Sequence, residues 1–280
     1  MSKRILVTGA NGYIGAEAVR ALLSKGAEVI AADLKCDHID PRAAFVGCNI
    51  LEDPEPLFRS GEMPDAVLHL AWQDGFDHNA PSHMGKLSAH YRFLTDLAER
   101  GAGQIAVMGS MHEIGYHEGE VDEDTPCRPL SQYGVAKNAL RQALELFCRQ
   151  RKIVFQWLRG FYLYGHDERN HSVFTRLLEA DAAGEKEFPF TSGTRRCDFE
   201  TVGELAEQIA SCVLQDRIQG VINCCSGRAQ SMGEVAERFI RERGLHIRLR
   251  LGAYPDRPYD SPAIWGSSAK IRSVMDKEKR

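Results

Sequence analysis

Tyr133 and Lys137 are the two side chains whose types and spacing best fit proton-transfer chemistry. They lie four residues apart at the start of a predicted helix over 132–151, so both are on one face of that helix. A phenol with its ordinary pKa of about 10 is a weak base at neutral pH, and a neighbouring ammonium lowers that pKa by stabilising the phenolate. The pair can therefore move a proton to or from a sugar or alcohol oxygen while another group carries hydride. Ser110, just after a predicted strand, can add a hydrogen bond to the same oxygen. The alternative is a packed tyrosine and a surface lysine.

Gly9, Gly12 and Gly15 follow the first predicted strand and open the first predicted helix. Glycines at this spacing permit a tight turn and bring a pyrophosphate close to the backbone N–H groups of the helix N-terminus. Asp33 ends the next predicted strand, about 20 residues on, where a carboxylate can accept both hydroxyls of an adenosine ribose. Because this acid repels a 2′-phosphate, it favours NAD over NADP, although Lys35 offers a phosphate contact and leaves NADP open. The alternative is a glycine turn that only packs a helix on a strand.

Strand-like and helix-like segments alternate along the chain, and they must position these residues. Strands are predicted at 5–8, 28–32, 66–70, 105–108, 153–158 and 221–225, and helices at 16–23, 87–100, 132–151, 172–184, 203–214 and 231–243. Short strands separated by helices imply parallel crossovers, so the predicted fold class is α/β: a Rossmann-type doubly wound parallel sheet with a small mixed α/β substrate lobe. We expect a dinucleotide-binding domain over 1–165 and a mainly substrate-binding lobe over 166–280, with segments near 198–226 returning to the first domain.

The composition is that of an ordinary globular protein, and it narrows the classes of partner. The chain has 280 residues and a net charge of −4, whereas a nucleic-acid-binding domain would usually carry a basic surplus. Its apolar runs are shorter than the ~18 residues of a membrane span. The eight cysteines form no Cys-x-x-Cys pair, which disfavours a metal site and is typical of reduced thiols in the cytoplasm. We therefore expect a cytoplasmic protein that binds no nucleic acid, no membrane and no metal.

Motifs spread along nearly the whole chain resemble one known family, the extended short-chain dehydrogenase/reductases. Within that family the likeness is to the NAD-dependent epimerase/dehydratase group, which acts on nucleotide sugars. The motifs that carry it are Thr8-Gly9-Ala10-Asn11-Gly12-Tyr13-Ile14-Gly15, Ser110, Tyr133-Gly134-Val135-Ala136-Lys137, Arg159-Gly160-Phe161-Tyr162-Leu163-Tyr164-Gly165, Asp198-Phe199-Glu200-Thr201-Val202, Asn223-Cys224-Cys225-Ser226-Gly227 and Arg257-Pro258-Tyr259-Asp260.

The resemblance implies roles for individual residues. The implied catalytic set is Ser110, Tyr133 and Lys137, with Lys137 also contacting the nicotinamide ribose. The residues implied around NAD are Gly9, Asn11, Gly12, Tyr13, Ile14, Gly15, Asp33, Asn49, Ile50, Leu70, Ala71, Trp72, Tyr133 and Lys137. Those implied at a nucleotide-diphosphate sugar substrate are His112, Asn170, His171, Arg196 and Arg257. The family commonly forms a homodimer through a four-helix bundle, and we expect one here.

Three positions depart from the family pattern. Asn49 stands where an acid usually lies near the adenine. Cys197 occupies the position of the usual arginine before Asp-Phe, which leaves Arg195 or Arg196 to substitute. Trp72 puts a bulky ring at the expected nicotinamide wall, where the family usually has a small residue.

The segment after Ser110 bears on the reaction. Nucleotide-sugar 4,6-dehydratases carry an acid–base carboxylate pair directly after this position, whereas Met111 and His112 follow Ser110 here and Glu113 comes one place too late. Water elimination is therefore disfavoured, and hydride chemistry at C4 remains. We expect NAD(P)-dependent reduction of a 4-keto-(6-deoxy) nucleotide sugar. The alternatives are a C4 epimerase that retains its NAD and a non-catalytic protein that senses the dinucleotide.

Overall fold

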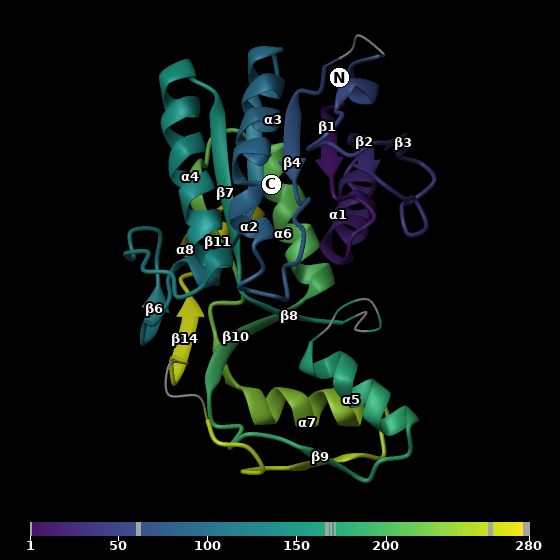
Figure 1. The fold of residues 1–280 in the computed structure, drawn as a ribbon, viewed down its shortest axis with the longest axis vertical. Helices are drawn as coiled ribbons and strands as arrows, with labels where there is room; N and C mark the ends of the chain where they lie inside the picture. Colours follow the sequence, from purple (N-terminus) through teal and green to yellow (C-terminus); the bar gives the residue numbers. More distant parts are fainter. Residues whose placement is uncertain are drawn as a thin grey trace.

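The computed structural model describes residues 2–59, 63–165, 168, 170, 172–256 and 260–276. Its largest element is a seven-stranded sheet in the order β11-β7-β5-β4-β1-β2-β3, in which every neighbouring pair is parallel (Figure 1). The chain order reverses between β1 and β4, and a doubly wound sheet binds its ligand in the crevice at such a point. The strands are β1 (Arg4–Thr8), β2 (Glu28–Asp33), β3 (Ala44–Gly47), β4 (Ala66–His69), β5 (Gln104–Ser110), β7 (Val154–Gly160) and β11 (Gly220–Cys224).

Helices cover both faces of this sheet, as its continuously buried strands require. One face carries Leu22, Ile209 and Ile271 in its core, and the other carries Leu94 and Leu144. The helices on the first face are α1 (Tyr13–Ser24), α6 (Val202–Leu214) and α8 (Ala269–Met275). Those on the second are α3 (Leu87–Glu99), preceded by the short α2 (Ser82–Gly85), and α4 (Gln132–Arg151). The predicted Rossmann-type fold class is confirmed. In the described part of the chain, none of these helices has the length and apolarity that crossing a membrane needs.

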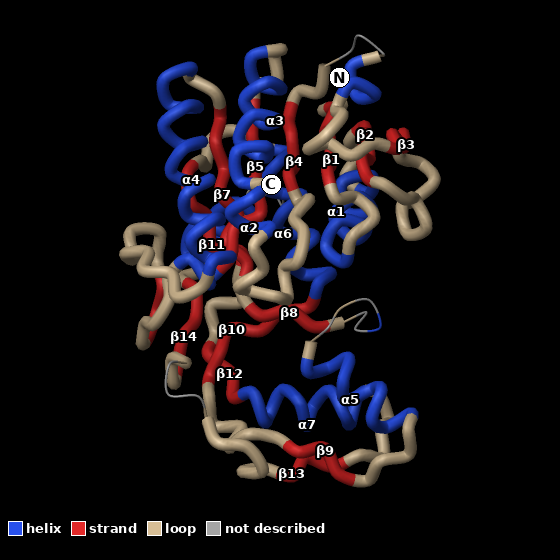
Figure 2. Tube along the Cα trace, in the orientation of Figure 1, coloured by secondary structure: helices blue, strands red, loops and turns tan. Residues whose placement is uncertain are grey.

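A smaller lobe lies beyond the carboxyl ends of the strands (Figure 2). Its main sheet has the order β12-β10-β14-β6, with β8 paired to β10, and β13 pairs with β9 separately. Its core is rich in phenylalanine, including Phe174, Phe188, Phe199 and Phe239. The lobe elements are β6 (Gly119–Val121), β8 (Tyr162–Tyr164), α5 (Val173–Ala182), β9 (Glu187–Pro189), β10 (Arg196–Thr201), β12 (Ala229–Ser231), α7 (Met232–Glu242), β13 (Arg248–Arg250) and β14 (Ala263–Gly266). Two 3₁₀ turns, η1 (Glu55–Phe58) and η2 (Met111–Glu113), complete the described elements.

Asp198 on β10 ties the lobe to the large sheet. Its buried carboxylate accepts hydrogen bonds from the Ser226 N–H (2.8 Å) and hydroxyl (2.6 Å), from the Gly227 N–H (2.9 Å) and from the Gly266 N–H (3.2 Å). These donors lie on the loop after β11 and at the end of β14. The Asp-Phe segment singled out in the sequence therefore fixes three strands relative to one another.

Several segments cross between the two units. The helices α6 and α8 and the strand β11 belong to the large sheet although they come late in the chain, whereas β6 joins the lobe from the first half. The return of α8 was not predicted, because a helix of seven residues carries little periodic pattern. We propose that residues 1–165, apart from β6 and β8, form the dinucleotide-binding unit together with α6, β11 and α8, and that the rest forms the substrate lobe.

Candidate active site

Ser110, Tyr133 and Lys137 lie together at the carboxyl edge of the large sheet. Ser110 is the last residue of β5, while Tyr133 and Lys137 lie in the first two turns of α4. A Cβ atom at Gly134 would come within 2.4 Å of the His112 carbonyl oxygen. Only a glycine therefore lets α4 approach the turn after Ser110 this closely, which brings the end of the strand and the start of the helix into contact.

The phenol of Tyr133 is protonated throughout the neutral range in this structure. Desolvation raises its pKa to about 12, while a hydrogen bond with Ser110 lowers it and the nearby charge of Glu113 raises it. The sequence predicted the opposite direction, with Lys137 lowering this pKa. That direction is wrong for this structure, because desolvation of the buried phenol outweighs the groups that lower its pKa. Tyr133 is thus prepared to give a proton rather than to accept one.

Lys137 is buried, and its ammonium has two fixed partners. The Nζ atom donates a hydrogen bond to the Met108 carbonyl oxygen at 2.8 Å and lies 3.8 Å from the centroid of the Trp72 ring. Desolvation lowers the pKa of Lys137 to about 7, against the opposing charge of Glu113. The charge on this side chain therefore changes within the physiological range of pH.

Glu113 is fully buried next to Ser110 and holds that residue in position. Its buried carboxylate accepts hydrogen bonds from the Ser110 N–H at 2.6 Å and from Trp157 Nε1 at 2.9 Å, and it lies 3.5 Å from Arg159 Nη2. Desolvation raises the pKa of Glu113, while Arg159 and the two N–H donors oppose this. A carboxylate engaged in this way serves to position Ser110 and is not placed to act on a substrate, which agrees with its late position in the sequence.

Several imidazoles gather around Tyr133 and Trp72, and three of them were missed by the sequence reasoning. His78 stacks on the Tyr133 ring, with 5.5 Å between ring centroids and 12° between planes, and its ring centroid lies 4.2 Å from that of His112. His90 stacks on the Trp72 ring, and His83 accepts a hydrogen bond from Trp72 Nε1. A signal existed in the run of histidines at 69, 78, 83 and 90, which the predicted helix over 87–100 and the loop before it could bring together. In the described part of the chain, no His, Cys, Asp and Glu side chains are grouped as a metal ion would need.

His112, which the sequence placed at the substrate, lies against the Tyr133 ring at 6.0 Å between centroids. Its backbone N–H donates to Ser110 Oγ at 3.3 Å. Desolvation lowers the pKa of His112 to about 4, and the charges of His78 and Arg195 lower it further. It is therefore a neutral imidazole that can exchange hydrogen bonds with a sugar hydroxyl but carries no charge near neutral pH.

The glycine loop has the shape that a dinucleotide needs. Gly9 has φ +69°, and a Cβ there would lie 2.6 Å from the Ala71 nitrogen. A Cβ at Gly15 would lie 2.0 Å from the Gly9 carbonyl oxygen, so α1 could not pack on the loop with any larger residue. Gly12 is the N-cap residue of α1 and has no side chain of its own that could cap the helix. The loop thus forms a cradle that side chains would fill, and it fits a pyrophosphate.

The other predicted cofactor residues surround this cradle. Asp33 accepts hydrogen bonds from the Asn11 N–H at 2.9 Å and the Leu34 N–H at 2.7 Å, which holds its carboxylate against the loop. The backbone carbonyl of Asp33 accepts a hydrogen bond from the Cys48 N–H, which brings the next residues of the chain, Asn49 and Ile50, close to Asp33. Leu70 and Ala71 extend from β4 beside Gly9, and Trp72 continues toward Lys137. Tyr13 donates from its hydroxyl to the Gly165 carbonyl at 2.6 Å, and Ile14 packs on the core of the α1 face.

The predicted substrate residues are less closely grouped. Asn170 is buried, and its Oδ1 accepts from the Ser172 N–H at 2.8 Å and the Thr175 hydroxyl at 2.7 Å, so it also fixes the start of α5. His171 and Arg257 lie outside the described residues. Arg196 is exposed, and its guanidinium donates to the Ala229 carbonyl at 2.9 Å.

Arg195 points the other way from Arg196 because side chains alternate along an extended segment. Its guanidinium donates to the Tyr162 hydroxyl at 2.9 Å, to Asp260 Oδ2 at 3.2 Å and to the Ser261 carbonyl at 3.1 Å. Its charge also acts on His112. Of the two arginines that were left open as substitutes for the one missing at Cys197, Arg195 is the one on the side of the site.

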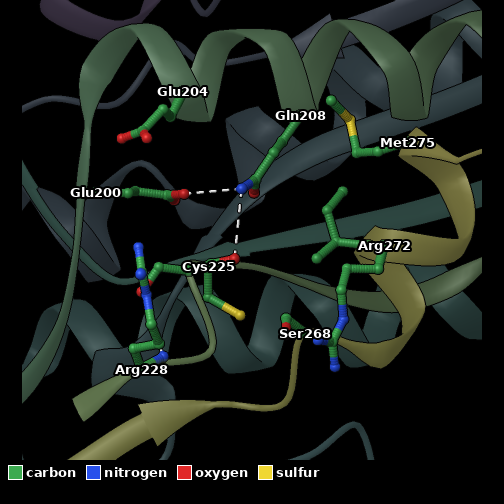
Figure 3. Close-up of a pocket in the computed structure, with 10 residues that line it drawn as sticks. Glu200, Glu204, Gln208, Cys225, Arg228, Ser268, Arg272 and Met275 are labelled. Carbon is green, nitrogen blue, oxygen red and sulfur yellow. Dashed lines mark hydrogen bonds between the residues drawn. The ribbon is translucent and has the colours of Figure 1, made fainter. Parts of the chain in front are cut away.

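A separate pocket of about 220 Å³ lies between α6, α8 and the loop after β11 (Figure 3). Gln208 Nε2 donates there to Glu200 Oε2 at 2.8 Å and to the Cys225 carbonyl at 3.3 Å. Among the described residues, nothing hydrogen-bonds to Glu200 Oε1 or Gln208 Oε1, and both atoms are shielded from water. The pocket contains none of the predicted catalytic residues, so it is distinct from the candidate active site.

Comparison with known proteins gives the family. The model of the NAD dependent epimerase/dehydratase family matches residues 5–225. The chain belongs to this family. The resemblance seen in the sequence is thereby confirmed.

Relatives of this family member include sugar-nucleotide enzymes of two kinds. A protein of Aggregatibacter actinomycetemcomitans named dTDP-6-deoxy-L-talose 4-dehydrogenase (NAD(+)) is 40% identical over 273 residues, which cover 94% of this chain and 99% of the relative. A UDP-glucose 4-epimerase of Neisseria meningitidis serogroup B is 27% identical, covering 98% of this chain and 95% of the relative. The solved UDP-N-acetylglucosamine 4-epimerase of Methanobrevibacter ruminantium superposes with a TM-score of 0.83 over 98% of this chain and 92% of its own, at 19% identity, which shows the shared fold.

Proposed function

We propose that this protein reduces the C4 carbonyl of a 4-keto-6-deoxy nucleotide sugar with NADH, and that it runs the reverse oxidation with NAD. The observation that carries the proposal is the placement of Ser110, Tyr133 and Lys137 at the carboxyl edge of the sheet, beside the glycine cradle. The reaction consumes one NADH and one proton and yields the 4-hydroxy sugar and NAD. The relative of 40% identity, named for the 4-dehydrogenation of dTDP-6-deoxy-L-talose, supports a dTDP-linked substrate.

The site residues divide the work of the reduction. When bound, NADH supplies a hydride to the carbonyl carbon. Tyr133 donates its phenolic proton to the carbonyl oxygen as negative charge develops there, and Ser110 adds a hydrogen bond to the same oxygen. Lys137 stabilises the phenolate that remains. The imidazoles of His78 and His112 line one side of Tyr133 and can bond the neighbouring sugar hydroxyls.

The name of the relative of 40% identity supports reduction over epimerisation, because it describes a 4-dehydrogenase that uses NAD(+). A phenol with a pKa of about 12 is in the form that donates a proton to a ketone. The oxidation step of either activity needs the phenolate, so the pKa of Tyr133 does not separate the two. Epimerisation with retained NAD remains the second candidate, and the relatives named UDP-glucose 4-epimerase favour it.

NAD is the proposed cofactor, with Gly9, Gly12 and Gly15 at its pyrophosphate and Asp33 at its adenosine ribose. Asn11, Asn49, Ile50, Leu70, Ala71 and Trp72 lie around this cradle and complete the proposed binding surface. Arg195, His112, Asn170, His171 and Arg257 are proposed on the substrate side. For Arg257 we propose a bidentate contact with the diphosphate, a geometry that lysine cannot reproduce.

The deciding experiment incubates the purified protein with dTDP-4-keto-6-deoxy-hexoses and NADH. Reduction predicts loss of NADH absorbance in equal amount to the sugar reduced, with release of NAD. An epimerase would instead interconvert UDP-glucose and UDP-galactose with no net change in NADH. Failure of both assays, with NADH binding intact, would leave the dinucleotide-sensing alternative and overturn the proposed activity.

We also propose a cytoplasmic homodimer formed through α3 and α4. Val135 and Leu146, 41% and 52% exposed, lie about three helical turns apart and so face the same side of α4. All eight cysteines, each within the described residues, are free thiols, which fits a reducing compartment. Light scattering should give the mass of two chains for the wild type, and Leu146→Glu should shift it toward one chain. A wild-type mass of one chain would contradict the dimer.

A further inference from the structure

Trp72 is the largest departure from the family pattern near the site, and its ring contacts the ammonium of Lys137. The distance of 3.8 Å from Nζ to the ring centroid lies well within the range of a cation–π interaction. The ammonium is buried, where such a contact is stronger than at an exposed site. Lys137 also donates to the Met108 carbonyl, so its ammonium has a second fixed partner. A remaining N–H can bond to Tyr133 or to a ribose hydroxyl.

The plane of the Trp72 ring is fixed by its own hydrogen bond. Trp72 Nε1–H donates to His83 Nδ1 at 3.1 Å, and His83 Nε2 lies 2.7 Å from the Asp77 carbonyl oxygen. An indole nitrogen can only donate, so His83 Nδ1 must be the acceptor and Nε2 must carry the proton that bonds to Asp77. Both nitrogens of a neutral His83 are therefore satisfied, and the indole has one favoured orientation.

The histidines near Trp72 add no competing positive charge, and the one further cation that acts on His90 among the described residues is Lys86 at the N-cap of α3. His90 stacks on the indole with ring centroids 4.5 Å apart and 14° between planes, and its Nδ1 lies 2.9 Å from His69 Nε2. Desolvation lowers the pKa of His90 to about 3 and also lowers that of His69. The groups that face Lys137 are thus neutral His69 on β4, neutral His90 on α3, Tyr133 on α4 and the carboxylate of Glu113.

We propose that Trp72 is a positioning residue for Lys137: its ring, held by His83, keeps the ammonium charged and aimed beside Tyr133. The inference rests on the proposed function for its effect on turnover, but the contact itself can be tested without turnover. The ring face favours the charged form of Lys137 and so opposes the desolvation that favours the neutral form. Without the ring, Lys137 should lose its proton at lower pH and sample other rotamers.

Two substitutions separate the ring face from the bulk of the side chain. Trp72→Leu keeps an apolar group and removes the aromatic face, whereas Trp72→Phe keeps a smaller aromatic face and loses the Nε1–H bond to His83. The first readout is the pKa of Lys137, followed by NMR of ¹³C-labelled lysine and assigned with Lys137→Arg. We expect Trp72→Leu to lower this pKa by about half a unit to one and a half units, and Trp72→Phe to lower it by less than half of that shift.

The second readout is the pH profile of kcat for NADH-dependent reduction. In Trp72→Leu, the loss of kcat at alkaline pH should begin at lower pH, and kcat at neutral pH should fall about tenfold. In Trp72→Phe, both the alkaline limb of the profile and kcat at neutral pH should stay close to those of the wild type. KM for the sugar should change less than kcat, because Trp72 does not act on the sugar.

The outcomes distinguish this inference from the proposed function. An unchanged Lys137 pKa and pH profile in a folded Trp72→Leu variant would overturn the role of Trp72, even if the wild type reduces the sugar. A wild type that reduces no sugar would overturn the proposed function, while a lowered Lys137 pKa in Trp72→Leu would still support the positioning contact. Equal pKa shifts in the leucine and phenylalanine variants would also overturn it, because packing alone would then explain the result.

Discussion

Two buried glutamates, Glu113 and Glu200, both have a pKa raised mainly by desolvation, and they differ in their partners. Glu113 beneath the active site accepts from the Ser110 N–H and Trp157 Nε1 and lies beside Arg159. Glu200 in the α6–α8 pocket accepts a hydrogen bond from Gln208, and its neighbouring charges are the acids Asp198 and Glu204. Desolvation is the main cause that raises the pKa of Glu200 to about 8, and the negative charges of those two acids raise it further.

The difference shows how one fold uses the same residue type in two ways. Glu113 has two N–H donors and the Arg159 cation around it, and such partners favour the charged carboxylate. Its hydrogen bond to the Ser110 N–H fixes the position of the serine. Glu200 is mostly protonated at neutral pH and carries no functional partner that the structure describes. Buried polar atoms without a hydrogen bond occur in both regions of the described chain, Arg159 Nε near Glu113 and Glu200 Oε1 in the α6–α8 pocket, so the difference lies in the partners of the two carboxyl groups.

The largest expected difference between the two regions is catalytic. Tyr133→Phe removes the proton that the ketone oxygen must receive, so kcat should fall roughly 10²–10⁴-fold. Binding of NADH, followed by fluorescence titration, should change little because the ring remains. Gln208→Leu in the other pocket is the matched control and should leave kcat unchanged. Retention of more than about a third of wild-type kcat by Tyr133→Phe would mean that the site is misplaced.

The second contrast concerns stability. Glu113→Ala leaves the Arg159 guanidinium buried without its carboxylate, which should lower the free energy of unfolding by about 3–5 kcal/mol. Glu113→Gln keeps the volume and one acceptor and should lower it less. Both changes are measured by chemical denaturation. A loss below about 1 kcal/mol for Glu113→Ala would show that the carboxylate does not neutralise Arg159 in the folded protein.

The third contrast is the pH dependence that Glu200 imposes. Its folded-state pKa of about 8 lies above the ordinary 4.5, so the folded protein holds a proton that the unfolded chain releases. Stability due to this group therefore falls as pH rises from 4.5 toward 8 and is level above that. Glu200→Gln mimics the protonated acid, so its stability advantage over wild type should grow with pH, by at most about 1.4 kcal/mol per unit. An advantage that is constant between pH 5 and pH 8.5 would contradict the raised pKa.

The smallest expected effect is the cofactor preference. Asp33 should repel a 2′-phosphate, so NADH should bind about tenfold more tightly than NADPH, a difference of about 1.4 kcal/mol. Asp33→Ser should reduce that preference toward unity without loss of NADPH binding. Tighter binding of NADPH by the wild type would reverse the role given to Asp33 and point to Lys35.

The elements that lie close in sequence were predictable, and the contacts between distant ones were not. The large sheet, the glycine cradle and the Tyr133–Lys137 pair follow from periodicity and from spacing within single turns or single helices. The contact of Trp72 with Lys137 joins segments 65 residues apart and depends on how α4 packs on β4 and β5. The direction of the Tyr133 pKa shift was mispredicted for the same reason, because desolvation depends on the packed site. Arg195 and Arg196 are neighbours in an extended segment, so their side chains point in opposite directions. Which of them faces the site depends on the register of β10 in its sheet, and the sequence alone does not give that register.

The central claim is hydride transfer to C4 of the sugar with Tyr133 as proton donor. It is tested most directly by a single turnover with NADH deuterated on the transferred face of the nicotinamide C4 and a dTDP-4-keto-6-deoxy-hexose, followed by NMR of the product. We predict one deuterium at sugar C4 and a product that matches dTDP-6-deoxy-talose or its C4 epimer in the wild type. Within the time that the wild type needs for this turnover, Tyr133→Phe should give at most about a hundredth of the labelled product. Deuterium at another sugar carbon, or equal labelling with Tyr133→Phe, would contradict the account.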